Sequence, residues 1–231
     1  MIKDTERNNA NSLIGKKYLS GIAFRFPNNS NITGRDVFVG IKAGGSNPKT
    51  SCVLNCAMVI ADNGIISGIL DRYYLHEEFK VISLNGASFG FSQFSLARKR
   101  ANYGGELYPP YFKDDYYISG VLNSADRIFT YDEDFVFGFL KEHLRWKKAE
   151  HQIFVNLSSV FSDFFNKSIS LKDAFSSLPA KAKNISYETL GAKESDTVLY
   201  DVFAMMDIYT FILSEQNIAK RGNKNGKEHR L

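Results

Sequence analysis

DVFVGIKAGGSNPKT (Asp36–Thr50) has the outline of a strand that runs into a catalytic turn. An apolar run is followed by a glycine pair and then by Asn47-Pro48. At the two positions where such a turn would carry carboxylates, this chain has Gly40 and Lys42. The segment is therefore either an ordinary strand and loop or a former active site that has lost its chemistry.

Outward from this segment, the sequence predicts a mixed α/β domain. Short apolar runs bounded by turn residues are typical of strands, and the expected strands are Val37–Ile41, Val53–Ala61, Ile65–Tyr74, Asp126–Tyr131 and Gln152–Leu157. Helices are expected at 95–105, after Pro110, and at Glu133–Lys148, 158–167 and Ser195–Gln216. Asn63-Gly64 suits a type I′ turn, so the second and third strands form an antiparallel hairpin. The pattern predicts a mixed five-stranded sheet flanked by helices.

The charge divides the chain into three parts. The whole sequence carries 29 Lys and Arg against 25 Asp and Glu, and residues 219–231 alone hold five basic residues against one acid. The remainder is balanced, which weakens the case for a basic nucleic-acid-binding body. We therefore expect a loose Asn- and Ser-rich arm at 1–35, one domain at 36–218, and a disordered basic tail at 219–231.

Several classes of protein are disfavoured by composition. Cys52 and Cys56 lie four residues apart in one expected strand, about 13 Å at strand rise, which is too far for a disulfide. The four histidines have no zinc spacing, so neither a metal nor a cofactor is expected. No apolar run approaches the 18 or more residues of a membrane span, and the N-terminal residues lack a signal-peptide core. A cytoplasmic protein without a membrane partner is the expectation, and the sequence leaves the oligomeric state open.

Three motifs occur in order along these elements. The first is the strand end Gly40-Ile41-Lys42-Ala43-Gly44-Gly45, and the second is FTYDEDFVFGFL, with Val136 near the start of a helix. The third motif is a pair of aspartates five residues apart, Asp196 and Asp201. Earlier in the chain stand three further matching segments, VLNCAMVIADNGIISG, FVNLSSVF and SLKDAF. From Asp36 to Glu215, this order resembles the DnaQ-like 3′–5′ exonucleases, the DEDD class with a ribonuclease-H-like fold.

The resemblance implies both a site and its loss. These exonucleases hold two divalent metals with four carboxylates and use a His or Tyr as base. At the matching positions this chain keeps only Asp201, because Gly40 and Val136 remove two carboxylates and Lys42 replaces a third. Asp196 stands where the base would be. The resemblance therefore implies a protein without exonuclease activity, in which Lys42 and Asp201 form an ion pair where the family has metals.

Nearby acids do not restore the missing ligands. Asp36 lies about 13 Å along the strand from Gly40. Asp132 and Asp134 precede Val136 and are expected to cap the start of the following helix instead of binding a metal.

Two basic clusters are candidates for contact with nucleic acid. Arg98, Lys99 and Arg100 form one, and Arg145, Trp146, Lys147 and Lys148 form the other, which includes the only Trp. Cations beside an aromatic ring can hold a single strand without reading its sequence. The alternative is a solvated helix end with Trp146 covering the core.

Three hypotheses for function remain. The first is a non-catalytic regulatory protein that binds nucleic acid, with Lys42 attracting phosphate. The second is a regulatory or adaptor protein that uses the same fold to bind another protein. The third is a metal-dependent exonuclease whose ligands have moved. Analogy of fold places nucleic acid slightly ahead of a protein partner.

Overall fold

The computed structural model describes residues 33–75, 98–102, 108–183 and 197–228. Its centre is one sheet with the strand order β3-β2-β1-β4-β5. The strands are β1 (Arg35–Ala43), β2 (Val53–Asp62), β3 (Ile65–Tyr73), β4 (Arg127–Thr130) and β5 (Ile153–Asn156). The expected five-stranded sheet is therefore present, with each strand within two residues of its expected bounds.

The sheet is mixed in direction, as the sequence predicts. β2 runs antiparallel to β1 and β3, and β4 and β5 run parallel to β1. Asn63 and Gly64 have φ values of 51° and 77°, which are the two positive values that a type I′ turn requires. The Asn-Gly pair thus sets the hairpin between β2 and β3.

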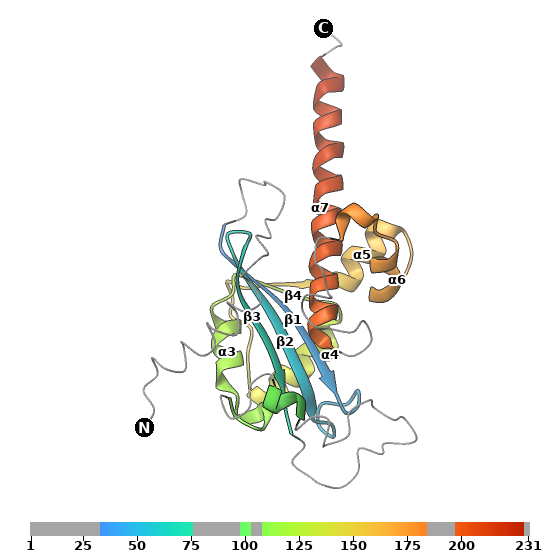
Figure 1. The fold of residues 1–231 in the computed structure, drawn as a ribbon. Helices are drawn as coiled ribbons and strands as arrows, with labels where there is room; N and C mark the ends of the chain where they lie inside the picture. Colours follow the sequence, from blue (N-terminus) through green and yellow to red (C-terminus); the bar gives the residue numbers. More distant parts are fainter. Residues whose placement is uncertain (1–32, 76–97, 103–107, 184–196, 229–231) are drawn as a thin grey trace.

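Helices cover both faces of the sheet (Figure 1). They are η2 (Phe112–Asp114), α3 (Tyr116–Asn123), α4 (Glu133–Leu144), α5 (Leu157–Phe165), α6 (Leu171–Ser176), η3 (Ala180–Ala182) and α7 (Val198–Glu228), and residues 98–102 are also helical. Among the helices of these described segments, none combines the length and the apolar character needed to cross a bilayer.

Alternate residues of β1 feed two separate cores. Phe38 stacks on Phe129 at 4.4 Å between ring centroids and belongs to the α7-side core, which includes residues of α5, α6 and α7. Val37 and Val39 belong to the α4-side core, with residues of α3 and α4. This period of two fixes which side chains of β1 can face α7.

Three helices differ from expectation. α4 ends at Leu144 and not at Lys148, because Arg145 takes a left-handed conformation with φ 52° and Trp146 N donates to Leu140 O. α6 was not predicted as a separate helix. α7 continues through Glu228, so residues 219–228, expected as a disordered tail, extend this helix.

Candidate functional site

The site begins where the end of β1 meets the start of α7. Asn55 lies opposite Lys42 in the β1–β2 ladder and is completely buried. Its side-chain Oδ1 accepts a hydrogen bond from Val198 N at 3.3 Å. The first turn of a helix leaves backbone N–H groups without partners inside the helix, so this bond anchors α7 over the sheet.

Gly40 lets α7 approach the sheet closely. A Cβ atom placed at Gly40 would lie 2.6 Å from Cγ1 of Val198 and 3.0 Å from Cγ2 of Val202. Both valines are buried, so neither has free space to move into. A carboxylate at position 40 therefore does not fit this packing, and the metal pair of the exonuclease family does not fit these residues.

The ion pair between Lys42 and Asp201 stays a prediction, and the charge of Lys42 acts on the carboxyl group of Asp201. Lys42 lies two residues beyond Gly40, on the same face of β1, and its charge lowers the pKa of Asp201. Desolvation by the surrounding protein is the larger effect, and it raises the pKa of Asp201 to about 6. The residue as a whole is exposed, so its carboxylate stands at the rim of the site and not inside a closed cavity.

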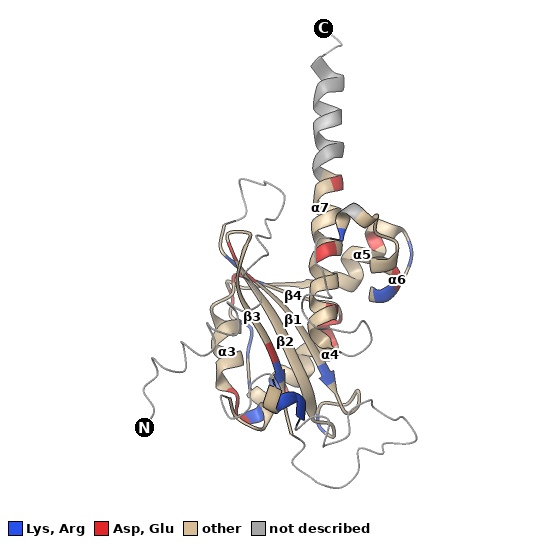
Figure 2. Ribbon diagram, viewed as in Figure 1, with Lys and Arg blue, Asp and Glu red and all other residues tan. Residues whose placement is uncertain are grey.

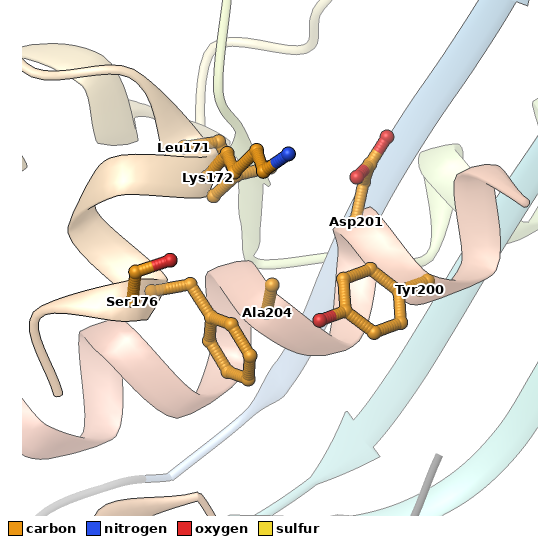
Figure 3. Close-up of a pocket in the computed structure, with 7 residues that line it drawn as sticks. Leu171, Lys172, Ser176, Tyr200, Asp201 and Ala204 are labelled. Carbon is orange, nitrogen blue, oxygen red and sulfur yellow. The ribbon is translucent and has the colours of Figure 1, made fainter. Parts of the chain in front are cut away.

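Asp201 also lines a hollow of about 290 Å³ between α6 and α7, here called the α6–α7 hollow (Figure 3). The lining residues are Leu171, Lys172, Phe175 and Ser176 from α6, and Tyr200, Asp201 and Ala204 from α7. Lys172 extends from α6 toward the carboxylate of Asp201 (Figure 3). The rings of Phe175 and Tyr200 meet edge to face at 5.8 Å. The hollow thus combines an aromatic surface with one cation and one carboxylate.

The other motif positions do not join this site. Val136 is buried in the α4-side core with Val37 and Val39, on the face of the sheet away from Lys42. Asp196 lies outside the described residues. The structure thus brings together Gly40, Lys42 and Asp201, and it places Val136 elsewhere.

The acids considered as replacement ligands have other partners. Asp132 caps α4 by accepting a hydrogen bond from Phe135 N at 3.0 Å. Asp36 is buried and accepts two bonds from Arg127, at 2.7 and 2.8 Å. Over the described ranges, no three His, Cys, Asp or Glu side chains gather in a way that could hold a metal ion.

The first basic cluster is split between surface and core. Arg98 is exposed, and Lys99 places its Nζ 5.5 Å from the ring centroid of Tyr73. Arg100 is buried, where it donates to the carbonyl oxygens of Tyr108 and Pro109. Arg100 therefore has a structural role, Lys99 lies over Tyr73, and Arg98 is the exposed member of the cluster.

The second basic cluster lacks the stacking ring that the sequence suggested. Trp146 is only 3% exposed, packs against Phe137 and Phe154, and donates from Nε1 to Asn123 Oδ1 at 2.9 Å. A base cannot stack on a ring that the core already covers, so the nucleic-acid-binding role for Trp146 is wrong and the alternative, in which this ring covers the core, is correct. Arg145, Lys147 and Lys148 are exposed around it, on the α4 side of the sheet.

Along its described side chains, α7 contributes only acidic charge. From Val198 to Gln216 it carries Asp201, Asp207 and Glu215 and no Lys or Arg (Figure 2). The positive charge around the α6–α7 hollow comes instead from Lys172 on α6, from Lys183 beside the ring of Phe175, and from Lys42 on β1. Any phosphate bound here would therefore be held from the β1 and α6 sides.

The α6–α7 hollow was missed because α6 was not predicted. A signal for this short helix was present in Ser170-Leu-Lys-Asp173, which has the spacing of a capping box. In the structure Ser170 Oγ accepts from Asp173 N at 3.1 Å and donates to its carboxylate at 2.7 Å. This local pattern begins α6 and so forms one wall of the hollow.

The chain matches no known protein-family model and no curated protein sequence. Solved structures of E. coli exonuclease I do match it. The crystal structure with a dT13 oligonucleotide aligns with a TM-score of 0.52 at 12% identity over 82% of this chain. The complex with a 5cy-dT13 oligonucleotide aligns with a TM-score of 0.48 at 13% identity over 80% of this chain. The zinc-bound complex with single-stranded DNA aligns with a TM-score of 0.49 at 14% identity, also over 80% of this chain.

These similarities show the fold and nothing finer. At 12% identity, the first alignment confirms the ribonuclease-H-like fold of the DnaQ-like exonucleases, with its mixed five-stranded sheet. This chain spans only 41 to 43% of the length of the three exonuclease I chains. Activity is a separate question, which depends on the residues at the site.

Proposed function

We propose that this protein binds single-stranded nucleic acid without metal and without cutting it, in a regulatory role. The observation that carries the proposal is the close packing of Gly40 against α7, with Lys42 two residues further along the same face of β1. The charge of Lys42 also acts on Asp201. The position that would hold a bridging carboxylate has no room for one, and the next position on that face carries a cation.

Electrostatics supports binding in place of catalysis. Two divalent metals need several carboxylates nearby to offset their charge, and an ammonium in the same site repels them. The same ammonium attracts a phosphate directly, as basic side chains do in most nucleic-acid contacts. Lys42 would thus take over one task of the metals, which is holding the backbone, and leave out the other, which is activating water.

Similarity of fold favours nucleic acid as the ligand. The exonuclease I structure with a TM-score of 0.52 contains a dT13 oligonucleotide, which supports a nucleic-acid ligand for a chain with the same fold. A direct binding measurement tests this ligand.

The test is binding of a fluorescent mixed-sequence 20-nucleotide strand in EDTA, followed by anisotropy over a range of salt. Lys42→Glu should weaken binding by about ten-fold or more at low salt, and the weakening should shrink as salt rises. Lys141→Glu makes the same charge change at an exposed position on α4 and should have little effect. Equal binding by both variants and the native protein would reject the Lys42 site.

A protein-binding role is the second candidate, and exposed aromatic side chains on α3 favour it. Tyr116 is 72% exposed and Tyr117 is 41% exposed, at the start of that helix. Tyrosine is enriched at the centres of protein interfaces. If the native protein fails to bind single strands at low salt, this surface becomes the better hypothesis.

A further inference from the structure

We propose that the α6–α7 hollow binds one unstacked nucleobase that carries an exocyclic amino group, while Lys42 holds an adjoining phosphate. This inference rests on the proposed function and adds to it the part of the ligand that is recognised and a preference among bases. It concerns the wall of the hollow that α6 forms, which was not part of the site expected from the sequence motifs.

The aromatic surface of the hollow suits a flat ring. Tyr200 is only partly buried and meets the buried ring of Phe175 at an interplanar angle of 76°. Lys183 Nζ lies 4.9 Å from the ring centroid of Phe175, so the ring of Tyr200 is the surface that a base can contact. Single-stranded nucleic acids are commonly held by stacking a base on such a ring. The volume of about 290 Å³ lies at the lower limit for small-molecule sites, so it suits one base and not a stacked pair.

The polar groups of the hollow select among bases. Asp201 offers carboxylate oxygens that accept hydrogen bonds, and Lys172 offers an ammonium that donates them. Cytosine and adenine each present an amino donor beside a ring-nitrogen acceptor, and guanine also carries an amino donor. Uracil and thymine have a carbonyl where cytosine has its amino group, and this carbonyl would face the carboxylate unfavourably.

The position of Asp201 joins the two halves of the proposed ligand. It lines the hollow, and it also lies close enough to Lys42 for that charge to act on it. A nucleotide with its base against Tyr200, the neighbour of Asp201 in the chain, would therefore bring a phosphate toward β1. Glu215 is exposed on α7 and would repel a phosphate placed further along that helix, which favours the end of the hollow near Lys42.

The experiment compares dC12 with dU12, because cytosine and uracil differ at their base edge and have rings of the same size. With the native protein, we expect dC12 to bind about five-fold or more tightly than dU12 in an anisotropy titration in EDTA. Lys172→Met should remove most of this preference, whereas Lys167→Met, at an exposed position that does not line the hollow, should keep it.

A second pair of variants tests the hollow by filling it. Ser176 is exposed and lines the hollow, whereas the adjacent Ser177 is exposed and does not. Ser176→Trp should bring the affinity for dC12 down to that for dU12, and Ser177→Trp should leave both affinities unchanged. Thermal midpoints for all variants show whether a loss of binding comes from loss of folding.

The outcomes separate this inference from the proposed function. Equal affinity for dC12 and dU12, with both reduced by Lys42→Glu, overturns the base pocket and leaves the proposed function standing. Binding that Lys42→Glu does not alter overturns the proposed function itself. A preference for cytosine that survives Ser176→Trp places base recognition elsewhere and also overturns the pocket.

Discussion

Asn55 holds the carboxyl group of Asp71 by donating from Nδ2 to Oδ1 at 2.9 Å. Because its Oδ1 accepts from Val198 N, this one buried amide links β2, β3 and α7. Burial raises the pKa of Asp71 to about 6, against the opposing effects of the Asn55 hydrogen bond and the charge of Lys99.

The contribution of Asp71 to the free energy of unfolding should therefore fall as pH rises from about 4 to about 6. The folded state keeps the proton of Asp71 where the unfolded chain, with its ordinary pKa near 3.8, has already lost it. Asp71→Asn removes this penalty and can still accept from Asn55. It should match the native protein near pH 4 and exceed it by up to about 3 kcal/mol above pH 7 in urea unfolding.

Asp62 provides a control of opposite sign. The hydrogen bond from Arg35 Nε at 2.7 Å lowers the pKa of Asp62, so its stabilising effect is present at neutral pH and is lost on acidification. Asp62→Asn should lower the free energy of unfolding at pH 7, and this loss should be smaller near pH 3. If the free energy of unfolding of Asp71→Asn changes with pH in parallel with that of the native protein, the pKa of Asp71 is not raised in the folded state.

Gly40→Ala should destabilise the protein by about 1–3 kcal/mol, because the new methyl group would overlap Val198. Gly120→Ala is the matched control. A Cβ at Gly120 meets nothing within 4 Å in the middle of α3, so that variant should gain about 0.5–1 kcal/mol from helix propensity. Chemical unfolding of both proteins measures the difference, and equal effects would mean that α7 does not pack against β1 as described.

Lys42 and Asp201 should show a weak but measurable coupling. Asp201 is exposed and Lys42 is only partly buried, so a double-mutant cycle with Lys42→Ala and Asp201→Asn should give about 0.2–1 kcal/mol. High salt should reduce the coupling. A coupling of about 3–5 kcal/mol would instead indicate a deeply buried pair.

Neither Mg²⁺ nor Mn²⁺ should bind at Asp201, and single-stranded DNA or RNA should remain intact on incubation with either metal. The reason is the loss of carboxylates at positions 40, 42 and 136 of the aligned motifs. Isothermal titration with each metal and a gel assay with a labelled strand provide the measurements. Metal-dependent cleavage that disappears in Asp201→Ala would show that other ligands have replaced the missing ones.

Truncation after Ala219 should leave the thermal midpoint nearly unchanged and weaken non-specific binding to polyanions. The removed segment holds five basic residues and one acid, and Ile212 is the last residue of α7 buried in the core among the described side chains. The slope of log affinity against log salt should become shallower, because fewer counterions are released. Binding of single strands that stays unchanged in the truncated protein would assign the affinity to the body.

Much of the fold was predictable because its signals are local. The Asn63-Gly64 turn fixes one hairpin, and the apolar runs on either side give β2 and β3 with nearly the expected bounds. The end of α4 was not predictable in the same way. Arg145 takes a left-handed conformation so that Trp146 can pack on Phe137, and that choice depends on tertiary contacts.

The site was predictable only in part, for a related reason. Lys42 and Asp201 lie at fixed positions of regular elements, β1 and α7, and the charge of Lys42 acts on Asp201. The α6–α7 hollow depends on a six-residue helix and on where α7 crosses it, and neither follows from periodicity. The close fit of Gly40 against Val198 likewise appears only when the helix is placed.

The burial of Trp146 gives the protein a built-in spectroscopic reporter. It is the only Trp of the chain, and it lies in the α4-side core, across the sheet from Lys42 and Asp201. Its intrinsic emission should shift to the red when that core opens to water and should respond little to a strand bound on the other face. Unfolding and ligand binding can therefore be followed separately in one sample, with tryptophan for the first and a labelled strand for the second.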